Sequence, residues 1–212
     1  MARKIKPLIY VFWEGESEQA YSKYLKKTFE DVAIIKPYSG KGLFSTAVNA
    51  FNNSPRYANS KDATDEIWFF FDTEVTNADQ WKANHKAINK LRKLRKTHIK
   101  VRLLMTTACF EYWLLLHYER CAPGITSPED KKRILDKVKS HLPLYRKGDE
   151  ESTFTIAKQH QTAINNGKWT LEQLVAVDIP TIEDKDERNA WLFAGQHTFT
   201  TVHEAVEYLK EL

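Results

Sequence analysis

The sequence has few cysteines and no long hydrophobic run. Its two cysteines, Cys109 and Cys121, are too few for a disulfide framework or a cysteine-based zinc site, and they suit a reducing compartment. The longest apolar runs, such as Leu8–Trp13, are far shorter than a membrane-spanning helix. No signal-type apolar segment follows the basic N-terminus. These absences predict a cytoplasmic protein without a membrane partner.

Neither sign of charge dominates the chain. The 32 Lys and Arg residues and 28 Asp and Glu residues give a formal net charge of +4, which is too even to indicate nucleic-acid binding by itself. Hydrophobic residues make up 42% of the 212 residues, which is enough for a full core. The length fits one domain, or one domain with a small appendage. Any functional argument must therefore rest on where the charges lie.

The first part of the chain alternates between apolar strands and amphipathic helices. Leu8–Trp13 is continuously apolar, which is typical of a central strand buried on both faces. A repeated strand–helix order predicts an α/β fold with a mostly parallel sheet flanked by helices, and places function at the carboxyl ends of the strands. Further strands are predicted at 32–35, 67–71 and 98–105, the last at an edge or half-exposed. Further helices are predicted at 18–29, 43–51, 78–96 and after 106–107.

After residue 125 the pattern becomes helical. Ser127 and Pro128 form a helix-start signal for 128–141. We therefore divide the chain into an α/β catalytic core, 1–124, and a mainly helical C-terminal extension packed on it, 125–212. Within the extension we expect helices at 154–166 and 198–212, a helix or irregular piece at 169–177, and an exposed acidic stretch at 181–190.

Acidic residues follow two of the apolar strands. Glu14 comes directly after Leu8–Trp13, and Asp72 and Glu74 follow the strand at 67–71. Neighbouring parallel strands would bring these carboxylates to one edge of the sheet, where oxygen ligands suit Mg²⁺. The sequence therefore predicts a site for Mg²⁺ or Mn²⁺ formed by Glu14, Asp72 and Glu74. The competing interpretation is that both strands simply end in polar residues at the surface.

Two further acids are candidate catalytic residues. Glu18 lies in the first turn of the helix that Ser17 is expected to cap, and is a direct or indirect ligand. Glu111 lies in the loop after the fourth strand, which should return to the same edge. His117 is a weaker candidate, because its place in an apolar helix favours a core histidine. Cys109 is expected to be a small buried residue.

A dense basic run is the clearest candidate for phosphate contact. Such a patch would attract nucleic acid without reading its sequence, although a solvated helix face is the plain alternative. Lys41, in a Gly-Lys-Gly turn, and Lys147, in a later loop, are further candidates. The candidate residues of the run are Lys90, Arg92, Lys93, Arg95, Lys96, Lys100 and Arg102.

Three motifs resemble those of the RloB-like proteins. They are Glu14-Gly-x-x-Glu18, Asp72-x-Glu74 and Cys109-Phe-Glu-Tyr-Trp-Leu-Leu-Leu-His117, and the resemblance covers most of the chain. It implies a Toprim-type fold similar to the nuclease half of bacterial anti-phage, abortive-infection systems. By this resemblance Glu14 would match the Toprim glutamate, Asp72 and Glu74 its Asp-x-Asp pair, and Glu18 and Glu111 further family acids.

The resemblance also implies Mg²⁺ or Mn²⁺ and a partner ATPase of ABC or SMC type encoded alongside. The expected function is a metal-dependent endonuclease that acts as a toxic effector, on DNA or on RNA such as tRNA. Two departures matter: Glu74 stands where Asp is usual, and Thr107-Ala108 where Asn-Pro is common. The alternative is therefore a catalytically weak subunit that binds nucleic acid or the ATPase. A homo-oligomer is possible, and the oligomeric state stays open.

Overall fold

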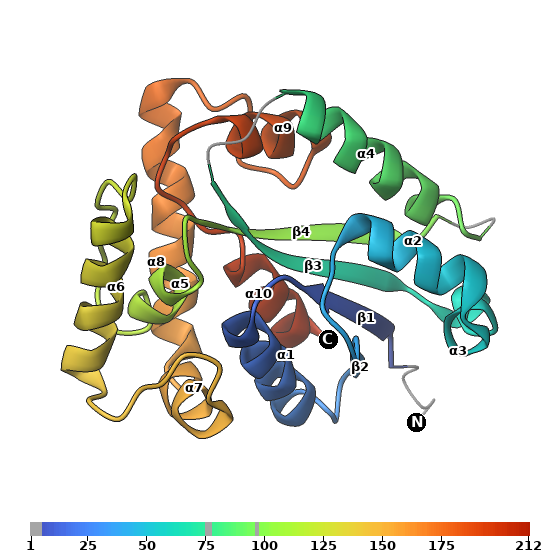
Figure 1. The fold of residues 1–212 in the computed structure, drawn as a ribbon, viewed down its shortest axis with the longest axis horizontal. Coiled ribbons are helices and arrows are strands. Elements are labelled where there is room, and N and C mark those ends of the chain that lie inside the picture. The colour runs from blue at the N-terminus through green and yellow to red at the C-terminus, as the bar shows by residue number, and fades with distance from the viewer. Residues whose placement is uncertain (1–5, 75–77, 96–97) are drawn as a thin grey trace.

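Four parallel strands form one sheet at the centre of the protein (Figure 1). The computed structural model describes residues 6–74, 78–95 and 98–212. The strand order is β2-β1-β3-β4, so the two most apolar strands, β1 and β3, are central neighbours. All three pairings are parallel, which confirms the predicted α/β sheet. The strands are β1 (Leu8–Trp13), β2 (Ile34–Pro37), β3 (Glu66–Thr73) and β4 (Lys100–Thr107).

One face of the sheet is covered by the helices that lie between β2 and β4 in the chain, together with two short elements of the C-terminal part. Tyr10 and Phe12 of β1 and Phe69 of β3 point into this core, where Phe51 and Leu91 come from the covering helices. Alternate strand residues face this layer because side chains in a strand point to opposite faces in turn. The elements here are α2 (Phe44–Asn53), α3 (Pro55–Ala58), η1 (Lys61–Ala63), α4 (Ala78–Arg92), η2 (Leu174–Val177) and α9 (Asp186–Ala194).

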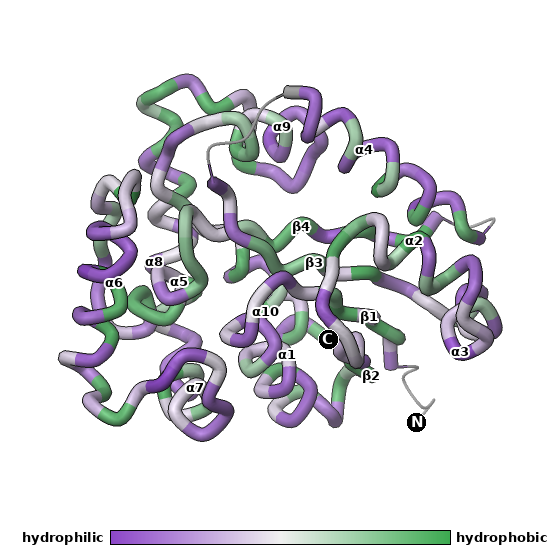
Figure 2. The backbone as a smooth tube through the Cα atoms, viewed as in Figure 1, coloured by the Kyte–Doolittle hydropathy of each residue, from purple (hydrophilic) through white to green (hydrophobic). Residues whose placement is uncertain are grey.

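The opposite face carries the first helix and most of the later ones. Val11 of β1 and Phe70 of β3 join Trp113, Val138 and Val206 in a second core, so residues on both sides of position 124 are packed together. Hydrophobic colour concentrates in the strands, while α4 and α6 are largely hydrophilic (Figure 2). The helices are α1 (Glu16–Thr28), α5 (Glu111–Leu115), α6 (Pro128–His141), α7 (Glu150–Ala157), α8 (His160–Gln173) and α10 (His203–Glu211).

The outer edge of β4 is covered by the segment that precedes α10. Thr106 forms an antiparallel bridge with Thr200, and the N–H of Thr201 donates to the oxygen of Met105 at 2.9 Å. This cover explains why β4 is mostly buried although it ends the sheet and was expected to be half-exposed. The cover also keeps 198–201 extended, so the C-terminal helix begins at His203 instead of Thr198.

Several predicted boundaries are wrong for local reasons. Thr106 and Thr107 belong to β4, pairing with Asp72 and Thr73, and therefore cannot cap the next helix. That helix, α5, is short and starts at Glu111. Ser17 does not cap α1, because its hydroxyl is used in the interior. The helix predicted over 78–96 ends at Arg92, and residues 96 and 97 lie outside the described residues.

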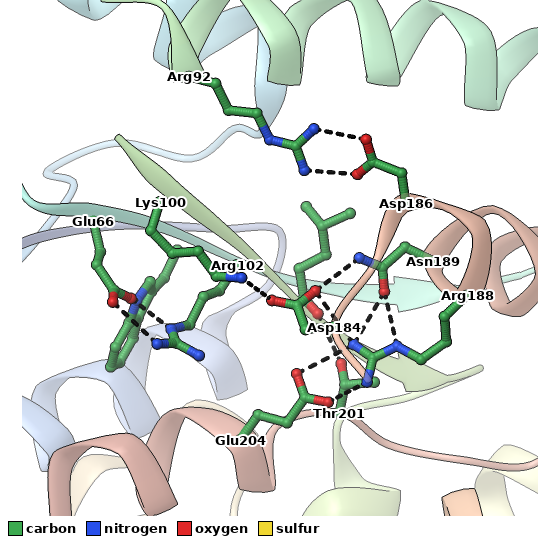
Figure 3. A network of polar contacts seen from close by, with 12 residues as sticks. Glu66, Arg92, Lys100, Arg102, Asp184, Asp186, Arg188, Asn189, Thr201 and Glu204 are labelled. Carbon is green, nitrogen blue, oxygen red and sulfur yellow. Dashed lines mark hydrogen bonds and ion pairs between the residues drawn. The ribbon is translucent and has the colours of Figure 1, made fainter. Parts of the chain in front are cut away.

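The acidic stretch at 181–190 is exposed only in part. It contains the start of α9, and Arg188 is 0% exposed. The guanidinium of Arg188 pairs with Glu204 and with Asp184, and Asn189 accepts a further hydrogen bond from it (Figure 3). A buried guanidinium needs such partners, which draws Asp184 inward, whereas Glu183 and Glu187 stay exposed. The buried part of the stretch was not predicted, because Arg188 gave no sign in the sequence of being buried.

No helix among the described residues is long and apolar enough to cross a membrane.

Candidate active site

The ends of β1 and β3 meet at the carboxyl edge of the sheet. Glu14 follows β1, Asp72 lies near the end of β3, and the N–H of Asp72 donates to Oε2 of Glu14 at 3.3 Å. Asp72 shares its strand face with Trp68 and Phe70, which pack in the core beneath α1 and α5. Both helices add an acid to this face. The two strand ends are therefore adjacent in space, as the sequence predicted.

Glu18 is supplied by the first turn of α1 and is only 3% exposed. A Cβ at Gly15 would lie 2.7 Å from Oε2 of Glu18, so the carboxylate occupies space that only a glycine leaves free. Burial raises the pKa of Glu18 from 4.5 to about 7, and the charges of Glu111 and Glu14 add to the rise. Glu18 is thus a carboxyl group that can hold or release a proton near neutral pH.

Glu111 is 2% exposed and is held by three donors. The hydroxyl of Ser17 donates to Oε1 at 2.8 Å and that of Tyr145 at 3.1 Å. The Lys147 ammonium lies 3.2 Å from Oε2. These contacts fix the orientation of the carboxylate and balance its charge. The sequence did not predict that Ser17 and Tyr145 donate to Glu111, because Glu111 lies 94 residues from Ser17 and 34 residues from Tyr145.

Asp72 carries an unpartnered buried atom. Its Oδ1 is shielded from solvent and has no hydrogen-bond partner. Burial raises the pKa of Asp72 well above its usual range, and the charges of Glu18, Glu111 and Glu14 raise it further. A divalent cation would satisfy this oxygen and offset the repulsion among the acids. The donor chemistry of Asp72 and Glu14 therefore fits Mg²⁺ or Mn²⁺.

Glu74 does not join these acids in the structure. Its side chain is exposed and pairs with Lys131 of α6. Among the described residues, no three His, Cys, Asp or Glu side chains are grouped as a ready set of metal ligands. Glu74 would have to leave Lys131 to bind a metal held by Glu14 and Asp72. The predicted ligand role of Glu74 stays a prediction.

Two cavities open beside the acids. The larger, about 850 Å³, extends from Glu14, Glu18 and Asp72 between α2 and α4 and is also lined by Lys41 and Lys147. The smaller, about 360 Å³, is lined by Asp72 and Glu111 and continues toward α6. Lys147 lines both cavities. The acids thus lie between two cavities, which together are large enough for an extended ligand.

The predicted basic run lies at the other edge of the sheet. Lys100 pairs in register with Glu66 at the start of β3, six residues before Asp72, which corresponds to roughly 20 Å of strand. The helix α4 runs from the carboxyl end of β3 back to the amino end of β4, so its last turn lies at the amino edge of the sheet. The exposed Lys90 and Lys93 occupy this end, and Lys96 lies outside the described residues.

All three arginines of this run have acidic partners within the described residues, and Figure 3 shows those of Arg92 and Arg102. Arg92 forms two hydrogen bonds with Asp186, at 2.8 and 2.6 Å. Arg102 pairs with Glu66, and Lys100 lies 2.7 Å from Asp184. Arg95 pairs with Asp65 at 3.5 Å. Contact of this run with nucleic acid stays a prediction, but those residues of it that the structure describes lie away from the acids at the carboxyl edge.

His117 and Cys109 are core residues. His117 is fully buried against Tyr21 and Trp113, with Nδ1 3.0 Å from the Trp113 carbonyl oxygen. Burial lowers the pKa of His117 to about 3, so the ring is neutral at pH 7. Burial raises the pKa of Cys109 to about 12, which keeps it a thiol. Neither side chain is suited to act as a base or nucleophile at neutral pH.

Residues 9–209 match the family of RloB-like proteins. The chain belongs to this family. The match spans nearly the whole chain and includes all three motifs on which the resemblance was based. No curated protein and no solved structure matches the chain.

Proposed function

We propose that this RloB-like protein is a nuclease that hydrolyses phosphodiester bonds of nucleic acid with the aid of Mg²⁺ or Mn²⁺. One observation carries the proposal. Glu14 and Asp72 meet at the carboxyl edge beside a large cavity, and Asp72 has a buried oxygen without a partner. Carboxylates so placed are suited to a divalent cation, and the bound cation would stabilise the attacking and leaving oxygens of a phosphodiester.

Each acid then has a separate task. Glu14 and Asp72 hold the cation. Glu18, with a pKa of about 7, is suited to take a proton from the attacking water or give one to the leaving oxygen. Glu111 is fixed by Ser17 and Tyr145 and positions the Lys147 ammonium, which can bind a phosphate oxygen beside the acids.

The cellular role belongs to the same proposal. Its support is membership of the RloB-like family, whose resemblance to anti-phage systems implies a toxic effector. We propose that the protein acts with an ATPase of ABC or SMC type encoded alongside it. Both DNA and RNA remain substrates to be tested.

A second candidate is a catalytically weak subunit that binds nucleic acid or its ATPase. The pairing of Glu74 with Lys131 favours it, because this acid is then not available as a ligand. Glu74 also replaces the Asp usual in the motif, which lengthens the side chain by one methylene. In this case the acids at the carboxyl edge would be retained without efficient cleavage.

Cleavage of a mixed panel distinguishes the two candidates. Plasmid DNA, single-stranded DNA and total tRNA would be incubated with Mg²⁺, Mn²⁺ or EDTA. The variant Asp72→Asn keeps the side-chain shape but removes its charge, and Asp79→Asn on the exposed start of α4 is the matched control. We expect metal-dependent cleavage by the wild type and the control, and none by Asp72→Asn. Equal activity of all three proteins would refute the proposed site.

A further inference from the structure

Three lysines flank the carboxyl-edge acids, and they come from three separate elements. Lys41 lies in the turn after β2, Lys147 in the loop before α7, and Lys132 on α6. All three side chains are exposed. Lys41 and Lys147 line the larger cavity, while Lys147 and Lys132 line the smaller one. The two cavities therefore connect the three lysines across the acids.

The position of Lys41 is fixed by its neighbour Gly42. The N–H of Gly42 donates to the oxygen of Trp13 at 3.2 Å, which ties the turn to the end of β1 beside Glu14. Gly42 has a φ of +144°, and a Cβ there would lie 2.2 Å from Oγ1 of Thr46. Only glycine fits this backbone conformation. The turn thus holds a lysine at one mouth of the larger cavity.

The position of Lys132 follows from how α6 is anchored. Ser127 and Asp130 form a capping box at its start, and Ile134 and Val138 are buried in the core. Lys132 is left on the exposed side, next to Lys131, which pairs with Glu74. In the described part of the chain, neither Lys132 nor Lys41 forms an ion pair with a carboxylate. Both ammonium groups are thus available to an external anion.

We propose that Lys41, Lys147 and Lys132 form a phosphate track, which holds successive phosphates of a nucleic-acid strand across the carboxyl-edge acids. This inference rests on the proposed action on nucleic acid and identifies the surface that binds it. The track lies at the edge where cleavage would occur, whereas the basic run around Lys90 and Lys93 ends α4 at the opposite edge. Backbone contacts of this kind supply affinity without sequence preference.

Binding in EDTA tests the phosphate track without cleavage. The probes are a fluorescein-labelled single-stranded DNA, an RNA of the same sequence and the DNA duplex, measured by anisotropy over a range of salt concentrations. The test variant is Lys41→Gln with Lys132→Gln. The control, Lys139→Gln with Lys158→Gln, removes the same charge from exposed residues that line neither cavity. Lys147 is left intact because it contacts Glu111.

We expect the test variant to bind single strands about 25-fold more weakly at 0.1 M salt, with the salt slope reduced by about 1.4, since each phosphate contact contributes about 0.7. The control should bind like the wild type. Which probe binds most tightly assigns DNA or RNA. Equal weakening of both variants, an unchanged test variant, or no binding by the wild type would each overturn the phosphate track.

The outcome is separable from that of the nuclease proposal. Binding that depends on Lys41 and Lys132, without cleavage in Mg²⁺ or Mn²⁺, would keep the phosphate track and favour the binding subunit. Cleavage with unchanged affinity and KM in the test variant would keep the nuclease and reject the track. Matching thermal unfolding of the two double variants would show that the lysines, and not the fold, cause any difference.

Discussion

Replacing Glu18 by glutamine should stabilise the metal-free protein above neutral pH. The Glu18 carboxyl group is 3% exposed, and its pKa rises from 4.5 to about 7 because of burial and then the charges of Glu111 and Glu14. A glutamine keeps the shape of the side chain and cannot ionise. Its amide can also donate hydrogen bonds to the neighbouring carboxylates.

The magnitude follows from the pKa difference between the folded and unfolded chains. Between pH 4.5 and about 7 the folded protein keeps a proton that the unfolded chain has lost, so the free energy of unfolding falls as pH rises. The loss is complete above pH 7 and amounts to about 3 kcal/mol, at about 1.4 kcal/mol per pH unit. Glu18→Gln avoids this loss and should raise the Tm by about 6 to 12 °C at pH 8.

The assay is thermal unfolding in EDTA at pH 4 and pH 8. At pH 4 the carboxyl group is mostly protonated in both states, so the variant and the wild type should differ by less than about 0.5 kcal/mol. The control is Glu30→Gln, an exposed position after the same helix, where a change within about 0.5 kcal/mol is expected at both pH values. A Glu18→Gln variant that is no more stable than the wild type at pH 8 would refute the reasoning. The variant should at the same time lose about 10² to 10⁴-fold in any cleavage rate.

Three further outcomes are expected. Arg188→Met should cost about 3 to 5 kcal/mol in urea unfolding, because it leaves Glu204 and Asp184 without their buried partner, whereas the half-buried Arg92→Met should cost about 1 kcal/mol or less. A similar loss at both positions would contradict the burial argument. Gly42→Ala should cost at least about 1 kcal/mol and weaken nucleic-acid binding, while Gly124→Ala, which meets open space, should do neither. Cys109 should resist iodoacetamide at pH 8 until the chain is unfolded in urea, and rapid labelling of the folded protein would be inconsistent with its raised pKa.

Local patterns in the sequence were a good guide to the sheet and to α6. The unbroken apolar character of β1 and β3 predicted two central strands, and the structure pairs them directly. The Ser127-Pro128 signal predicted the bounds of α6, because its capping box is formed within four residues of chain. Both features depend on interactions near in sequence, which a pattern can record.

Features that depend on distant contacts were misjudged. The sequence predicts Ser17 as a helix cap, but its hydroxyl donates a hydrogen bond to the buried Glu111. The 181–190 stretch has the composition of an exposed segment, but Arg188 is buried there and pairs with Asp184. The basic run at 90–102 was dense enough to suggest a binding surface. Its distance from the acids follows only from the connection between α4 and β4.

The sequence by itself determined the parallel α/β sheet, the family, and which carboxylates follow the central strands. Periodicity decides the sheet, strand ends place the carboxylates and short motifs identify the family, and all three are local features of the sequence. Only the tertiary structure decided that Glu18 and Asp72 share a buried site with Glu111, that Glu74 is held by Lys131, and which lysines flank the acids. The physical reason is that pKa, ion pairing and access depend on the distance and burial of side chains from elements far apart in the chain.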